Sequence, residues 1–117
     1  MIYVALIGHG PNWLPGKSVY EQGQPVRDHL AAMRSRYEEG SLLLGGPFDR
    51  GGGIAVLDVA GELEARELMD ADPGVVAGVM SYELHHLTAY FDAFHSFSAA
   101  GSVDDLARLK ATSGGGR

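Results

Sequence analysis

The sequence predicts a small α+β domain, and three observations support this. Four short apolar segments and two amphipathic segments follow one another in the order β-α-β-β-α-β. Clusters of glycine and proline separate the segments at the points where the chain must turn. The chain has 117 residues, which is enough for one domain and too few for two.

The first predicted strand covers residues 2–9 and is apolar on both faces. Its side chains alternate between two sets, one on each face: Ile2, Val4 and Leu6, and Tyr3, Ala5 and Ile7. A strand with two apolar faces is buried on both sides. Helices would cover only one side of the sheet, so the simplest cover for the other is a partner subunit. This pattern therefore predicts a homodimer.

The first predicted helix covers residues 25–39 and follows a loop over residues 10–23. Pro25 suits the first turn of a helix, and Gly40 suits the position just after its end. The helical spacing predicts an inward stripe of four residues, Val26, Leu30, Met33 and Tyr37.

The rest of the domain is predicted to contain three more strands and a second helix. Strands are predicted over residues 41–48 and 54–59, with a glycine-rich turn between them. A helix over residues 61–71 ends where Pro73 follows, and a last strand covers residues 79–88. The inward residues of the second helix are expected to be Leu63, Ala65, Leu68 and Met69. This order is that of a ferredoxin-like fold with a four-stranded antiparallel sheet.

We expect residues 1–90 to form the domain and residues 91–117 to be a C-terminal extension. The pattern of residues 104–110 is typical of a short helix. Residues 113–117, which are mostly glycine, predict a disordered end.

Composition narrows the classes of partner. The net charge is −6, and the nine lysines and arginines are scattered, which disfavours a nucleic-acid partner. The chain has no cysteine, which is consistent with a cytoplasmic protein. The apolar N-terminus is too short for a signal peptide or a membrane span, so no membrane partner is expected.

Three segments of the predicted fold meet at one end of the sheet: the start of the first helix, the turn after residues 41–48, and the junction before the last strand. They bring together His29 and Asp72, which could form a proton-transfer pair. A neutral imidazole is a general base near pH 7, and a carboxylate on its other nitrogen fixes the tautomer. Backbone N–H groups near Gly45 and Gly46 could stabilise a developing oxyanion. The simpler reading is that His29 lies on the helix surface and Asp72 belongs to an ordinary turn.

The predicted substrate-binding residues surround this pair: Trp13, Arg27, Gly45, Gly46 and Pro47. Trp13 would act as a lid from the loop over residues 10–23. The chemistry needs no metal and no cofactor.

The other histidines do not predict a metal site. His85 and His86 are neighbours on a strand, so their side chains point to opposite faces. With His9 and His95 they lack the spacing of metal ligands.

Several segments match the pattern of a known family. They are the opening residues 1–4, His29 with Leu30, residues 39–47 (EGSLLLGGP) and, most specifically, residues 70–79 (DADPGVVAGV). In this combination, which spans residues 1 to about 90, the chain resembles the YciI-like (YCII-related) family. The loop over residues 10–23 and the long tail depart from the family pattern.

The resemblance implies a dimeric α+β barrel with an active site built on a histidine and an aspartate, by position His29 and Asp72. It implies a small cofactor-independent enzyme, such as a lyase, dehydrochlorinase or isomerase, that acts on a small phenolic or acidic substrate. Two alternatives remain open. One is a non-catalytic small-molecule-binding or accessory module, and the other is a heme-binding oxygenase that uses His86 or His9.

Overall fold

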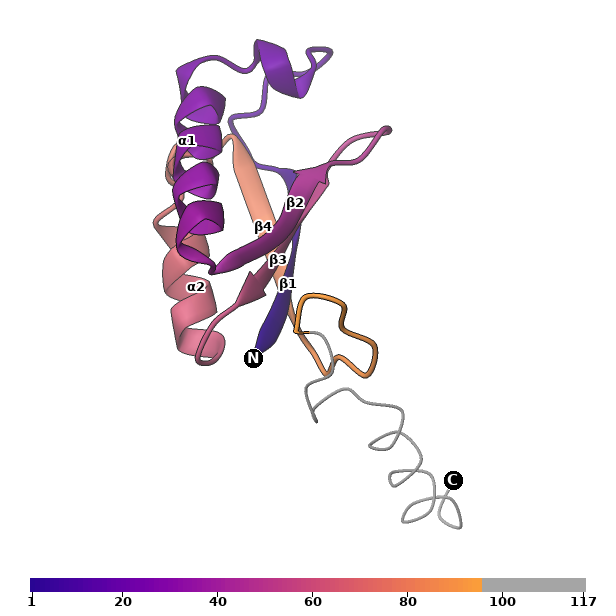
Figure 1. Ribbon diagram of the computed structural model, residues 1–117. Coiled ribbons are helices and arrows are strands. Elements are labelled where there is room, and N and C mark those ends of the chain that lie inside the picture. Colours follow the sequence, from indigo (N-terminus) through magenta and orange to yellow (C-terminus); the bar gives the residue numbers. More distant parts are fainter. Residues whose placement is uncertain (96–117) are drawn as a thin grey trace. The chain divides into compact units, whose positions relative to one another are not determined.

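The computed structural model describes residues 1–95, and the chain divides into two units between Leu87 and Thr88 (Figure 1). All the elements described below belong to the first unit. The predicted helix over residues 104–110 and the predicted disordered end lie outside the described residues. None of the helices in the described part has the length and apolar character to span a bilayer.

The first unit has the predicted α+β architecture, with four strands in one antiparallel sheet. Its elements are β1 (Ile2–His9), the 3₁₀ turn η1 (Val19–Glu21), α1 (Gln24–Glu39), β2 (Leu42–Pro47), β3 (Gly53–Asp58), α2 (Glu62–Asp70), the short α3 (Pro73–Val76) and β4 (Met80–Leu87). The strand order is β2-β3-β1-β4, so β2 and β4 are the edges. Both long helices lie against one face of the sheet (Figure 1).

The core lies between this face and the helices. Tyr3 and Ala5 of β1 and Ala55 and Leu57 of β3 point toward it at alternate positions, as the pleat of a strand requires. The helices and β2 contribute the remaining buried residues of this cluster, which include Met33, Leu42, Ala65, Leu68 and Met69. Burial of these side chains is the main stabilising contribution to the fold.

The helix faces differ from the prediction. Leu30 and Tyr37 are 54% and 64% exposed, and Leu63 is 73% exposed, so these three are not core residues. On α1, Val26 and Met33 are buried as predicted, and the third buried residue is His29. The apolar periodicity does not predict His29, because a polar residue occupies this buried position.

The region after α2 also differs. Pro73 does not simply end a helix, because it is the first residue of α3, and Asp72 is the N-cap residue of that helix. Proline is favoured at this position because its missing N–H has no partner in the first turn of a helix. The chain therefore makes one more helical turn before β4.

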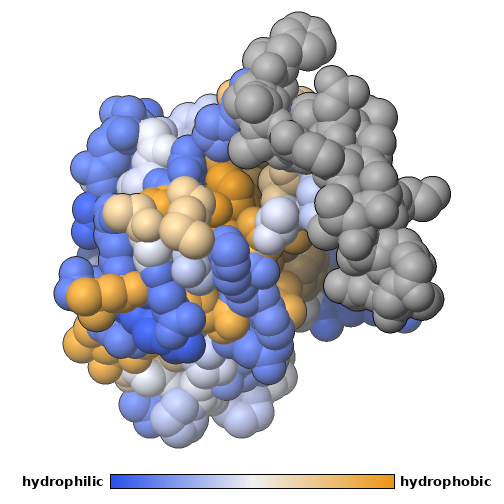
Figure 2. Space-filling model, turned by 90° about the horizontal axis from the view of Figure 1, so that it is seen from below, coloured by the Kyte–Doolittle hydropathy of each residue, from blue (hydrophilic) through white to orange (hydrophobic). Residues whose placement is uncertain are grey.

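The sheet face away from α1 and α2, here called the outer face, has a mainly apolar centre. The register places on it a set of residues from all four strands: Ile2, Val4, Leu6, Leu44, Ile54, Val56 and Leu87. No element of residues 1–87 covers this face (Figure 1). Apolar surface is also exposed between hydrophilic side chains in the view from below (Figure 2).

Candidate active site

The structure brings His29 and Asp72 into contact. Nδ1 of His29 lies 2.8 Å from Oδ2 of Asp72, and the two residues are 8% and 3% exposed. His29 lies on α1 one turn after its start, and Asp72 lies between α2 and α3. A histidine and an aspartate, which can carry opposite charges, are therefore buried next to each other between the helices.

Local backbone structure fixes the carboxylate of Asp72. Its Oδ2 accepts a hydrogen bond from the backbone N–H of Gly74 at 3.0 Å, which caps the N-terminus of α3. Oδ2 thus binds the helix end and the imidazole together. The other oxygen, Oδ1, is buried and has no hydrogen-bond partner among the described residues.

Gly74 leaves room for the pair. A Cβ atom at this position would lie 2.8 Å from Sδ of Met80, 3.1 Å from Oδ2 of Asp72 and 3.3 Å from Cβ of His29. Any other residue would crowd the carboxylate and the base of the histidine side chain. The glycine in the segment DADPGVV therefore avoids close contacts with all three side chains.

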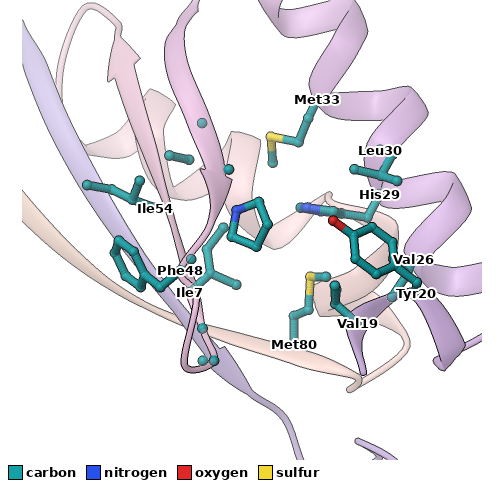
Figure 3. Close-up of a pocket in the computed structure, with 18 of the residues that line it drawn as sticks. Ile7, Val19, Tyr20, Val26, His29, Leu30, Met33, Phe48, Ile54 and Met80 are labelled. Carbon is teal, nitrogen blue, oxygen red and sulfur yellow. The ribbon is translucent and has the colours of Figure 1, made fainter. Parts of the chain in front are cut away.

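The arrangement favours one tautomer of His29. A carboxylate accepts hydrogen bonds and does not donate them, so Nδ1 of a neutral imidazole donates its proton to Asp72. Nε2 then carries the lone pair. The His29 ring projects from α1 into a pocket (Figure 3). The chemical capability of the pair is proton transfer between Nε2 and a molecule in that pocket.

The pocket has a volume of about 930 Å³ and lies between α1, the β2–β3 hairpin and the loop over residues 10–23. Most of its lining is apolar, including Ile7, Val26, Leu30, Met33, Phe48 and Met80 (Figure 3). Asp72 is not part of the lining, and its contact with the pocket residues is the one with His29.

Four of the five predicted substrate-binding residues line this pocket: Trp13, Gly45, Gly46 and Pro47. Arg27 does not line it. It is exposed, and its Nε donates to the side chain of Gln24. Two positions along a helix correspond to a rotation of about 200°, so Arg27 and His29 face nearly opposite directions.

The lysine and arginine side chains of the pocket are those of Lys17 and Arg34, neither of which is among the predicted site residues. Lys17 comes from the loop over residues 10–23. Arg34 lies on the same side of α1 as Leu30, one turn further along, and its Nε is 3.3 Å from the carboxylate of Glu38. In the sequence, the only signal for Arg34 is its i, i+4 spacing from Leu30.

Gln22 organises the loop that brings Trp13, Lys17 and Tyr20 to the pocket. Its side chain is buried, and it accepts from the backbone N–H of Leu14 at 2.7 Å. Its amide nitrogen donates to three backbone carbonyl groups, those of Leu14, Lys17 and Ser18, at 3.1–3.2 Å. A glutamine in a polar loop gives no sequence signal for such a role.

The remaining histidines have separate surroundings. The His9 ring stacks on Trp13 at 3.8 Å with an interplanar angle of 6°, and both line the pocket. His86 packs against Tyr3 on the helix side of the sheet, whereas His85 pairs with Glu83 on the outer face. Within residues 1–95, no three histidine or carboxylate side chains are grouped to hold a metal ion.

Comparisons with known proteins give a family match and a solved structure with a similar fold. The family model described as YCII-related domain matches residues 1–88. No curated protein matches the chain. Among solved structures, the chain is similar to 5-chloro-2-hydroxyhydroquinone dehydrochlorinase (TftG) from Burkholderia phenoliruptrix AC1100 in complex with 2,5-dihydroxybenzoquinone. The identity is 17%, the TM-score is 0.59, and the alignment covers 76% of this chain and 95% of that chain, so the likeness concerns the fold.

Proposed function

The chain belongs to the YCII-related domain family, and from this premise we propose that it is a small enzyme that moves a proton on a small-molecule substrate. His29 is the general base, and Asp72 positions it. The observation that carries this function is the 2.8 Å contact between Nδ1 of His29 and Oδ2 of Asp72 beside a large pocket. A pair of this kind typically contributes ~10²–10⁴-fold to a rate through acid–base catalysis.

In the reaction, Nε2 of His29 takes a proton from an acidic C–H or O–H group of the substrate. The negative charge of Asp72 stabilises the imidazolium that forms. In an elimination, the electron pair left on the substrate forms a double bond and expels a leaving group as an anion. In an isomerisation, the imidazolium returns the proton to another atom of the substrate. Both reactions balance without an oxidant or reductant.

The glycines of β2 allow the substrate to approach the backbone. Gly46 lines the pocket, and a Cβ atom at this position would meet no atom within 4 Å. A substrate oxygen that becomes negative could occupy this space near backbone N–H groups. We assign Gly45 and Gly46 this role and Trp13 a place in the pocket wall.

A second subunit covers the outer face of the sheet in the working enzyme. An apolar centre contributed by four strands is costly to expose to water, and a second copy would bury it by a two-fold relation. The pocket lies mainly on the opposite side, between α1 and the β2–β3 hairpin, and Leu44 and Ile54 of the outer face also belong to its lining. A homodimer formed in this way would cover the pocket at these two residues and leave its α1 side open to substrate.

The TftG likeness suggests the first compounds to test. Chlorinated hydroquinones, other phenols and small carbon acids would be screened for thermal stabilisation of the full chain, because a ligand raises the melting temperature by mass action. Each stabilising compound would then be incubated in D₂O with enzyme, and deuterium incorporation or halide release would be followed by NMR and ion chromatography.

The variants His29→Gln and Arg27→Gln form a matched pair for this test. His29→Gln is expected to lose deuterium incorporation and turnover but to keep binding, whereas Arg27→Gln should behave as the wild type. Full activity of a folded His29→Gln variant would refute the role of the base.

The alternative of a non-catalytic binding module rests on the pocket, which is large and mainly apolar and offers few polar groups to a ligand. This alternative predicts thermal stabilisation by a ligand without exchange of any of its protons. The same D₂O experiment therefore separates the two functions.

A further inference from the structure

The pocket beside His29 is much larger than a single aromatic ring requires. An engineered cavity of about 150 Å³ holds benzene, so the pocket volume of about 930 Å³ is roughly six times that. Pockets of 300–1,000 Å³ typically hold drug-sized ligands. We infer that the substrate is a flat aromatic compound of at least two fused rings, an inference that rests on the proposed function for its proton transfer.

The chemistry of the walls fits a flat apolar ligand. Four aromatic side chains line the pocket, Trp13, Tyr20, Tyr37 and Phe48. Tyr20 and Phe48 lie on opposite sides of it (Figure 3). Aromatic rings pack against one another in offset-stacked or edge-to-face arrangements and so favour ring systems over branched chains.

Two methionines, Met33 and Met80, reach the pocket from α1 and β4 (Figure 3). The thioether is polarisable and adapts its shape to a ring edge, and sulfur–aromatic contacts are favourable. Met33 lies on α1, one turn after His29, and Met80 lies on β4. A ring that presents an acidic proton to Nε2 would therefore have soft apolar contacts around it.

The size of the pocket comes from walls that the structure holds in place. On one side, the four hydrogen bonds of Gln22 fix the loop that carries Lys17 and Tyr20. The start of this loop is held by Asn12, whose backbone N–H donates to the carbonyl of Gly78 at 2.8 Å and whose side chain donates to that of Ala77 at 2.8 Å.

The opposite wall is the β2–β3 hairpin. The backbone N–H of Phe48 donates to the carbonyl of Gly52 at 2.8 Å and closes its turn. The space between the loop and the hairpin is thus bounded on both sides by hydrogen-bonded backbone.

The charges of the lining allow an acidic substituent on the ligand. Lys17 and Arg34 line the pocket with one carboxylate, that of Asp49, although the whole chain has a net charge of −6. Lys17 forms no ion pair with any of the described residues. A fused-ring ligand that carries a carboxylate or phenolate matches the positive charge of Lys17, since Arg34 is already paired with Glu38.

The test compares two probes with the same polar groups and different ring systems, 3-hydroxy-2-naphthoate and 2-hydroxybenzoate. Isothermal titration calorimetry of the full chain should give a dissociation constant at least about tenfold lower for the naphthoate, because the second ring buries four more carbon atoms. Phe48→Ala and Tyr37→Ala should reduce this ratio, and the exposed Leu63→Ala on α2 should leave it unchanged.

Equal affinity for the two probes, or tighter binding of the benzoate, would overturn the inference. A preference for the naphthoate that Phe48→Ala and Tyr37→Ala leave intact would also overturn it, since the second ring would then bind elsewhere. The result is independent of the D₂O experiment. A clear ring preference without proton exchange on any compound would refute the catalytic function alone, and exchange on monocyclic compounds without ring preference would refute the ligand class alone.

Discussion

Oδ2 of Asp72 lies 2.8 Å from Nδ1 of His29, a residue 43 positions earlier in the chain. The same oxygen accepts a hydrogen bond from the backbone N–H of Gly74 and so caps α3. This one oxygen atom therefore contributes both to the candidate active site and to the local fold of α3. Substitutions here can be designed to separate the two contributions.

The Asp72→Asn variant should keep the native fold and have a much lower kcat. Asparagine is as good an N-cap residue as aspartate, so the carboxamide oxygen can still accept from Gly74. The negative charge that stabilises a protonated His29 is lost, so kcat should fall by ~10²–10⁴-fold. Asp28→Asn, on the exposed side of α1, is the control, and both variants should show wild-type circular dichroism. A drop in kcat of the same size in Asp28→Asn would contradict this explanation.

Gly74→Ala should damage both stability and activity. The new Cβ would lie 2.8 Å from Sδ of Met80, which must move, and would press on Asp72 and His29. Overpacking of this kind costs about 1–3 kcal/mol in the free energy of unfolding. Urea denaturation would measure it, with Gly61→Ala as the control, because a Cβ at Gly61 meets no atom within 4 Å. Equal stabilities of the two variants would show that the site relaxes without cost.

Gln22→Ala should loosen the loop more than it unfolds the domain. The substitution removes the partner of the Leu14 N–H and of the Lys17 carbonyl, whereas the carbonyls of Leu14 and Ser18 keep the bonds that they accept from Lys17 and Glu21. A buried unsatisfied group costs about 1–3 kcal/mol. Hydrogen exchange should accelerate over residues 14–21 and stay unchanged in β1 and β3. Gln24→Ala, whose side chain contacts only exposed residues, provides the comparison. Uniform acceleration over the whole sheet would mean that the loop is part of the global folding unit.

Leu6→Glu should dissociate the proposed homodimer. Leu6 lies in the outer face beside Ile54 and opposite Glu83 of β4, so a new carboxylate would meet both an apolar partner surface and a like charge. Sedimentation velocity should give a dimer for the wild type and a monomer for the variant. Leu63→Glu, on the exposed side of α2, should remain dimeric. A monomeric wild type at concentrations near 100 μM would refute the homodimer.

Tyr82 should make stability sensitive to alkaline pH. Partial burial of its hydroxyl, its hydrogen bond to Asp70 at 2.7 Å and the charge of that carboxylate raise the pKa of Tyr82, against the opposing effect of Arg66. The folded state therefore holds this proton more tightly than the unfolded state. The stabilisation is complete below the ordinary tyrosine pKa of about 10 and is lost as the pH rises above it.

The measurement is the free energy of unfolding of the wild type and Tyr82→Phe between pH 7 and pH 11. At pH 7 the variant should be less stable by about 0.5–1 kcal/mol, because it lacks the hydrogen bond to Asp70. The difference between the two proteins should shrink above pH 10. A difference that does not change with pH would show that the hydroxyl does not titrate as proposed.

The sequence was sufficient for the architecture because its strongest signals are local. The apolar residues 2–9, the alternation in residues 79–88 and the glycine and proline clusters between segments predict the order of strands and helices along the chain. Helix faces were harder to assign, since Leu30 and Leu63 fit a helical stripe and yet are exposed. A pocket beside α1 accounts for Leu30, because side chains that line a pocket are apolar without being core.

Only part of the candidate site could be predicted from the sequence. Topology indicated that His29 and Asp72 would lie near each other, and the structure places them in contact. Lys17, Arg34 and Gln22 were missed because their importance depends on where a loop folds back, which no short-range pattern encodes. Arg27 lies two residues before His29, and side chains two positions apart on a helix do not share a face, so Arg27 does not line the pocket.

The strand order has a consequence for how copies of the chain meet. β2 is an edge strand, and an open edge is a template for uncontrolled strand addition and polymerisation. This edge ends in Gly45, Gly46 and Pro47, which offer weak strand propensity and, at the proline, no N–H donor. The residues that give the pocket its backbone surface thereby also protect the molecule against growth of the sheet into fibrils.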